Sequence, residues 1–205
     1  MKYETPPYIM DKLNKIYDNK KKNKLKSAGS FLAGKIKNEY ILYNDQPNAP
    51  QGKCNHLDQE IFDWFMQRFK DYVDTLESWD LALRLSSMWV NDMKAGEYNP
   101  VHHHSSNRSL IGLSSVMFLK IPKTYGKEIS FPEKPTNGRL EFLGNANGQF
   151  LLPNFTPKAA VGDLFVFPYD LQHVVYPFVG SKEYRRTLSA NVDTITLYAE
   201  GVPKK

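Results

Sequence analysis

Three consecutive histidines at positions 102–104 are the first residues whose types and spacing could do chemistry. Alternate side chains of an extended segment point to the same side, so His102 and His104 can converge while His103 points away. Imidazole nitrogens spaced in this way are a natural pair of metal ligands. For these residues taken alone, a polar loop without a metal is an equally good interpretation.

His173 strengthens the metal interpretation. It lies in FVFPYDLQHVVYPF, residues 165–178, which reads as an apolar strand, a turn and a second strand. A lone histidine there would more often be a hydrogen-bonded core residue. Together with His102 and His104, however, it would supply three ligands on one face of a metal and leave positions open for substrate and dioxygen.

The stretch YRRTLSAN, residues 184–191, predicts a pocket for an anion. Strand alternation places Arg185, Thr187, Ser189 and Asn191 on one face and Arg186, Leu188, Ala190 and Val192 on the other. Burying an arginine with three short polar side chains is costly unless they bind something. Arginine offers a two-pronged fork to a carboxylate, and the neighbouring hydroxyl can bind the same group. The alternative is an exposed edge strand.

The elements that must position these residues are mostly strands. Short β-branched and aromatic runs separated by Gly, Pro and Asn follow Ser87, which is typical of antiparallel strands in a sandwich or barrel. The runs are MWVNDM, LSSVMFLKI, KEISF, GRLEFLG, DLFVFP, HVVYPF and RRTLSANVDTITLY. Apolar residues spaced three and four apart predict helices over 7–20 and 58–76, and 43–52 reads as a loop. We expect one domain over 1–205, with a helical N-terminal cover (1–86) on a β core (87–200).

Composition limits the function classes. With 205 residues and 41% hydrophobic content, the chain suits one packed domain. The net charge of +5 comes largely from the lysine-rich segment 19–26, which we interpret as a solvated helix end or loop, with a nucleic-acid contact the less favoured alternative. Cys54 is the only cysteine, so no internal disulfide can form. Without an apolar leader or membrane span, we expect a soluble, cytoplasmic protein of unknown oligomeric state.

The order His-x-His, distal His and then Arg-x-Thr resembles that of the 2-oxoglutarate and Fe(II)-dependent oxygenases. The similarity is greatest to their prolyl-4-hydroxylase-like branch and to small predicted oxygenases of marine phages and bacteria. It depends on MWVNDMKAGEYNPVHHH, SSVMFLKIP, AVGDLFVFPYDLQHVVYPF and YRRTLSANV, and covers residues 87–192. The resemblance implies a mainly β fold with N-terminal helices and a double-stranded β-helix (jelly-roll, cupin-like) core.

The resemblance also implies roles for single residues. His102, His104 and His173 match the iron ligands, and Arg185 with Thr187 matches the pair that binds the distal carboxylate of 2-oxoglutarate. Asn91 is a further candidate contact to this cosubstrate. Many members of the branch add a tyrosine on the strand after the first ligands. This sequence has Phe118 near there, so that contact is missing or comes from elsewhere.

His104 departs from the family pattern, which has Asp or Glu at this position. A neutral imidazole leaves the site one unit more positive, and three histidines suit zinc, copper and nickel as well as iron. We favour a working three-histidine site. In the alternative, a carboxylate such as Asp170 completes the site.

The implied reaction is hydroxylation of a substrate with dioxygen, coupled to decarboxylation of 2-oxoglutarate to succinate. The branch favours a peptidyl residue such as proline, while a small molecule remains open. Loops 105–110 and 123–147 are where we expect substrate selection. One rival is a cupin-like three-histidine metalloenzyme without 2-oxoglutarate, for which an Arg185–Thr187 anion clamp is unnecessary. The other is a non-catalytic metal-binding β-sandwich module.

Overall fold

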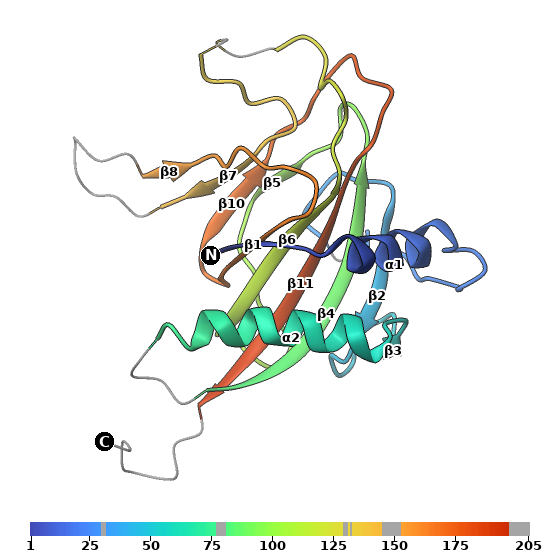
Figure 1. Ribbon diagram of the computed structural model, residues 1–205, viewed down its shortest axis with the longest axis vertical. Helices are drawn as coiled ribbons and strands as arrows, with labels where there is room; N and C mark the ends of the chain where they lie inside the picture. The colour runs from blue at the N-terminus through green and yellow to red at the C-terminus, as the bar shows by residue number, and fades with distance from the viewer. Residues whose placement is uncertain (30–31, 77–80, 129–130, 132, 145–152, 197–205) are drawn as a thin grey trace.

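The described residues form two antiparallel sheets and two helices (Figure 1). The computed structural model describes residues 1–29, 32–76, 81–128, 131, 133–144 and 153–196. Within these residues the larger sheet has the order β1 (Lys2–Glu4), β9 (Asp163–Pro168), β6 (Gly112–Lys120), β11 (Arg185–Thr196), β4 (Leu81–Met93), β2 (Glu39–Asn44) and β3 (Cys54–Asn55). The smaller sheet has the order β5 (Asn99–His102), β10 (Gln172–Val175), β7 (Leu140–Leu143) and β8 (Asn154–Phe155).

Both expected helices are present and pack on the larger sheet. Helix α1 (Pro7–Asp18) starts with a proline, which suits the first turn, and α2 (Gln59–Val73) is capped by Asp58. The Asp58 carboxylate accepts a hydrogen bond of 2.9 Å from the backbone N–H of Ile61. The buried stripes are Ile9, Leu13 and Tyr17 on α1, and Ile61, Phe65, Phe69 and Val73 on α2. These stripes form one hydrophobic core with the outer face of the sheet.

Strand β11 of the larger sheet has one face toward the core under the helices and the other toward the smaller sheet. Leu188, Ala190 and Val192 join the core under the helices, whereas the side chains between them face the smaller sheet. The exposed edge strand considered as an alternative is wrong, because β11 pairs with β4 on one side and β6 on the other. A second core between the sheets contains mainly aromatic and branched residues, including Phe118, Phe142 and Phe167. Because successive side chains of β11 alternate, one set packs under the helices and the other set faces the smaller sheet.

The N-terminal region contributes strands as well as helices, which differs from the expected division at residues 86 and 87. β1, β2 and β3 belong to the larger sheet, and β4 begins at Leu81. β2 was not predicted because it is largely buried on both faces and so lacks polar alternation; it also takes in the first residues of the expected 43–52 loop. β5 is short and contains a proline, which hides it in the sequence. In KEISF, residues 129 and 130 lie outside the described residues, and the rest form no strand.

The lysine-rich segment 19–26 forms turns after α1. Lys21, Lys22 and Lys24 are exposed, while Leu25 is buried and anchors the segment to the core. This arrangement fits a solvated helix end. No helix in the described part of the chain is long and apolar enough to cross a membrane.

Candidate active site

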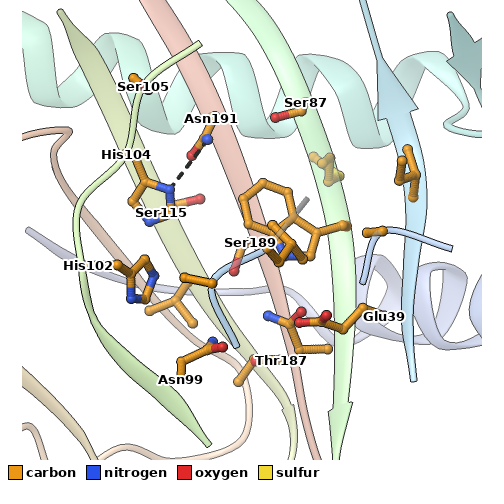
Figure 2. Close-up of a pocket in the computed structure, with 18 of the residues that line it drawn as sticks. Glu39, Ser87, Asn99, His102, His104, Ser105, Ser115, Thr187, Ser189 and Asn191 are labelled. Carbon is orange, nitrogen blue, oxygen red and sulfur yellow. Dashed lines mark hydrogen bonds between the residues drawn. The ribbon is translucent and has the colours of Figure 1, made fainter. Parts of the chain in front are cut away.

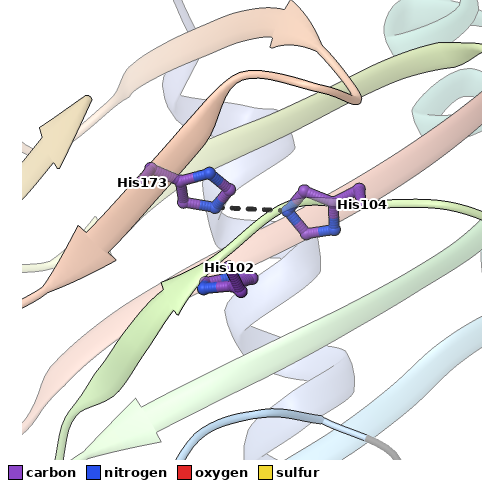
Figure 3. A group of neighbouring side chains, drawn as sticks. All are labelled: His102, His104 and His173. Carbon is purple, nitrogen blue, oxygen red and sulfur yellow. Dashed lines mark hydrogen bonds between the residues drawn. The ribbon is translucent and has the colours of Figure 1, made fainter. Parts of the chain in front are cut away.

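The three histidines lie together at one end of the smaller sheet (Figure 3). His102 ends β5 and pairs directly with His173 of β10, while His104 follows just beyond the strand. The backbone N–H of His104 donates to the carbonyl of Tyr169 at 2.9 Å, which holds this segment extended. One nitrogen from each of the three rings lies within 4.8 Å of the others, whereas His103 is exposed. The predicted convergence is therefore observed.

Hydrogen bonds to backbone carbonyls leave Nε2 free in two of the three rings. Nδ1 of His102 lies 2.7 Å from the carbonyl oxygen of Pro100, and Nδ1 of His173 lies 3.0 Å from that of Leu171. A carbonyl only accepts, so in both rings Nδ1 carries the proton and Nε2 is left bare. The Nε2 atoms of His104 and His173 are 3.2 Å apart. Backbone carbonyls that orient histidines in this way are typical of metal sites.

The ring of His104 is oriented by a side chain. Nδ2 of Asn191 lies 3.5 Å from Nδ1 of His104, and the hydroxyl of Ser114 donates to Oδ1 of Asn191 at 2.8 Å. Asn191 belongs to the inward face of β11, and Ser114 is its partner on β6. Each of the three imidazoles thus has a contact at Nδ1 that fixes the orientation of its ring.

Burial keeps the histidines neutral. Desolvation lowers the pKa of His104 well below its ordinary value and lowers that of His173 to about 4. The pKa of His102 is lowered for the same reason. Aromatic neighbours supply the low-polarity surroundings, including Phe167, whose ring centroid is 4.9 Å from that of His173. Neutral imidazole is the form that binds a metal, so the cluster is ready to bind without first losing protons.

The cluster fits a divalent transition metal. Two nitrogens bound at about 2.1 Å and at right angles would lie about 3 Å apart, close to the 3.2 Å between Nε2 of His104 and Nε2 of His173. The grouping contains no carboxylate among the described residues. Asp170, the alternative ligand, is exposed and interacts electrostatically with Tyr72 of α2, so it does not belong to the cluster.

Arg185 is the second unusual group, because it is a buried cation that has no anionic partner among the residues that the structure describes. Arg185 is only 2% exposed, and its guanidinium carbon lies 4.8 Å from the centre of the Phe118 ring. Nη1 donates to the hydroxyl of Thr187 at 3.4 Å, but Nε and Nη2 have no partner in the described structure. Burial lowers the pKa of Arg185, and an interaction with the Tyr125 hydroxyl opposes this effect. Two guanidinium nitrogens without partners are suited in chemistry to bind a carboxylate.

A cavity of about 480 Å³ connects the histidines with the polar face of β11 (Figure 2). Its walls include Asn91 and Thr187, and Arg185 lies next to Thr187. This volume is typical of a small-molecule site. The residues predicted from the sequence are thus brought together: three histidines at one end and Asn91, Thr187 and Arg185 toward the other.

Three further residues belong to this region but were not predicted as site residues. Asn191 was placed on the correct face of β11, but nothing in the sequence indicated its contact with His104. Tyr125 follows β6 in a loop and gave no signal. Glu39 lies in the unpredicted strand β2 and also lines the cavity.

Comparisons with known proteins agree with this geometry. Residues 87–191 match the family model described as "Putative 2OG-Fe(II) oxygenase", where 2OG is 2-oxoglutarate. The match spans half of the chain, so the chain belongs to this family. No curated protein sequence matches it significantly.

Solved structures show the same fold at low sequence identity. A prolyl-4-hydroxylase from Pseudomonas putida aligns with a TM-score of 0.57 and 15% identity, covering 94% of this chain and 91% of that chain. A prolyl hydroxylase from Trichoplax adhaerens, in complex with a hypoxia inducible factor peptide fragment, gives 0.58 and 11%, covering 94% and 82%. HygX from Streptomyces hygroscopicus, with nickel, 2-oxoglutarate and hygromycin B bound, gives 0.53 and 10%, covering 94% and 82%. The predicted double-stranded β-helix core is thereby confirmed.

Proposed function

We propose that this chain is an Fe(II)- and 2-oxoglutarate-dependent dioxygenase that hydroxylates its substrate and converts 2-oxoglutarate to succinate and carbon dioxide. One observation carries the proposal. Three convergent histidine nitrogens line a cavity of about 480 Å³. Arg185 is buried, has no anionic partner among the described residues, and lies next to Thr187 in the wall of the same cavity. A cation site and an anion site within one pocket suit a cosubstrate that chelates a metal at one end and carries a free carboxylate at the other.

His102, His104 and His173 would hold Fe(II), which supplies the redox chemistry that activates dioxygen when it is bound with 2-oxoglutarate. The three imidazoles take one face of the metal and leave the opposite face for ligands. Because all three are neutral, the bound cosubstrate is the anion that balances the metal. The carbonyls of Pro100 and Leu171 hold two of the rings in the required tautomer.

Arg185 and Thr187 would bind the distal carboxylate of 2-oxoglutarate, with Asn91 as a further contact. The face of Phe118 packs on the guanidinium and fixes its orientation before the ligand arrives. Tyr125 interacts with Arg185 from the loop after β6 and takes the place of the tyrosine that the family resemblance leads one to expect near Phe118. Such preorganisation favours a bound cosubstrate in a single pose.

The aromatic wall would exclude water from the reacting atoms. Phe167 and Phe142 pack against His173, and Trp89 lies beside His104. A dry site strengthens each electrostatic contact and prevents loss of reactive species to water. We infer a single domain that acts in the cytoplasm, with loop 105–110 and the described part of loop 123–147 selecting the substrate.

Anaerobic titration of the Fe(II)-loaded protein with 2-oxoglutarate tests the proposal. A weak visible charge-transfer band should appear as the chelate forms. It should be lost at the same cosubstrate concentration in Arg185→Ala and retained in Arg186→Ala, whose side chain lies on the other face of β11. If iron binds and no band forms, the site belongs to a three-histidine metalloenzyme that does not use 2-oxoglutarate. Closed coordination by four protein ligands would instead indicate a non-catalytic metal-binding module.

A further inference from the structure

Glu39 is a carboxyl group buried in the cavity wall without a partner. It is the first residue of β2 and is 0% exposed. Neither carboxyl oxygen has a hydrogen-bond partner in the part of the chain that the structure describes. Gly29 lies beside it, since a Cβ atom there would be 3.5 Å from Oε2 of Glu39, an ordinary van der Waals contact. The carboxyl group therefore lies between Gly29 and the cavity.

A polar row crosses the inner face of the larger sheet at this level. Strand pairing places Glu39 of β2 beside Asn91 of β4, and Asn91 beside Thr187 of β11. All three residues line the cavity, and Figure 2 shows Glu39 directed toward Thr187. Oδ1 of Asn91 also has no partner among the described residues. Once Glu39 is ionised, two neighbouring acceptors thus lack a donor among the described residues, and a ligand with N–H groups can supply it.

The local electrostatics favour a cation. Burial raises the pKa of Glu39 to about 8, with a further contribution from the like charge of Glu97. No cationic side chain in the described structure contributes to this shift. Arg185 is a buried cation beside the pocket, and in the proposed complex its partner is the distal carboxylate of 2-oxoglutarate. An ionised Glu39 consequently needs a positive charge in direct contact with it, which neither the described residues nor 2-oxoglutarate provide.

We propose that Glu39 and Asn91 form a substrate subsite that recognises a protonated nitrogen, as found in an ammonium or guanidinium group. The inference deepens the proposed oxygenase function and depends on it, because the ligand would be the molecule that is hydroxylated. Glu39 accepts the N–H donors as a carboxylate, and Asn91 accepts one more through Oδ1. A peptidyl proline does not fit this subsite, because its ring nitrogen is an uncharged amide without a hydrogen.

The subsite fits two sources of the same chemistry. A free amine or basic amino acid could enter the cavity whole, or a lysine or arginine side chain of a peptide could reach into it. The volume of about 480 Å³ leaves room for a small group beside the cosubstrate. Binding assays with both forms distinguish these sources.

Ligand-observed NMR on the protein loaded with Zn(II) and 2-oxoglutarate tests the subsite without turnover. The probes are n-butylammonium and methylguanidinium, with butanol and methylurea as uncharged counterparts of similar shape. The cations should bind more tightly than their counterparts, and Glu39→Gln should weaken them about 10- to 100-fold. Asp170→Asn, an equal charge change at an exposed position, should leave binding unchanged. Comparison of L-lysine with Nα-acetyl-L-lysine amide, which keeps the side-chain ammonium group, then distinguishes a free amino acid from a peptidyl lysine as the source.

Several outcomes would overturn the inference. Equal binding of charged and uncharged probes would do so, as would cation binding that is unaffected in Glu39→Gln. A loss of metal affinity in Glu39→Gln would assign Glu39 to the charge balance of the metal instead. The charge-transfer band keeps this test separate from that of the proposed function. A band that survives in Glu39→Gln, together with lost cation binding, supports both. Cation binding without any band would leave a cation site at Glu39 but would overturn both the oxygenase and the role of this site in substrate recognition.

Discussion

Asn191 lies with its side-chain amide 3.5 Å from Nδ1 of His104, and its Oδ1 accepts a hydrogen bond from Ser114. In this arrangement the amide donates to Nδ1, so the ring proton is on Nε2 and points at His173. A half-turn of the amide exchanges its oxygen and nitrogen. Nδ1 could then donate to Oδ1, which would free Nε2 of His104 for a metal while the amide nitrogen donates to Ser114. Asn191 is thus suited to both the metal-free and the metal-bound state.

Replacement of Asn191 by Ala should weaken metal binding about 10- to 100-fold, because His104 loses the group that fixes its ring. Asn191→Asp keeps an oxygen that can accept from Nδ1 and should recover most of the affinity. Competition with a chelator measures both variants. Asn107→Ala, in a loop where Asn107 contacts Gln46 and Pro47, is the matched control. Equal affinity in Asn191→Ala and the control would refute an orienting role.

Arg185 and Arg186 should give opposite results when each is changed to Ala. Arg185→Ala should weaken 2-oxoglutarate binding by about 30-fold or more without lowering the free energy of unfolding, since it removes a buried cation for which the described part of the chain offers no anionic partner. Arg186 pairs with Asp92 at 3.0 Å and with Asp18 at 2.9 Å. Arg186→Ala should therefore lower the free energy of unfolding by about 3 kcal/mol and leave cosubstrate binding intact. Titration calorimetry and urea unfolding measure the two effects, and similar losses of cosubstrate affinity in both variants would contradict the assignment.

His104→Asp should retain metal binding within about tenfold, because a carboxylate can ligate the metal and also balances part of its charge. His104→Ala offers no ligand atom and should lose more than about 100-fold. Exposed His103 provides the control, since His103→Ala should bind metal normally. Chelator competition followed by circular dichroism separates loss of a ligand from loss of fold. A folded His104→Asp protein that binds no metal would count against a simple exchange of imidazole for carboxylate.

The stability of metal-free Glu39→Gln should exceed that of the native chain increasingly as pH rises. The pKa of Glu39 is raised from 4.5 to about 8 in the folded state. Between these values the unfolded chain releases a proton that the folded chain retains, so native stability falls with rising pH. Glutamine does not titrate, and the difference in unfolding free energy should shift in its favour by more than about 1 kcal/mol between about pH 5 and about pH 8. Urea unfolding at several pH values checks this, and parallel profiles would show that Glu39 ionises freely.

The site could be found from the sequence wherever its residues share one short segment. His102 and His104 are spaced for convergence by strand alternation, and the same rule places Arg185 and Arg186 on opposite faces of their strand. Both helices were predicted, because their apolar residues repeat at the helical period. These signals are local, since backbone geometry alone fixes which neighbours share a face.

Only the tertiary structure showed which distant residues meet. Glu39 looks like an ordinary polar residue until β2 pairs with β4 and buries it beside Asn91. Asn191 acquires its role because β11 carries it to His104, and Tyr125 because its loop returns to Arg185. Strand pairing across long stretches of chain is decided by the packing of the two sheets and the helices on them. The sequence by itself therefore determined the family resemblance, the candidate metal ligands and the candidate anion clamp. Packing decided which groups contact those histidines and which carboxyl group is buried in the cavity wall.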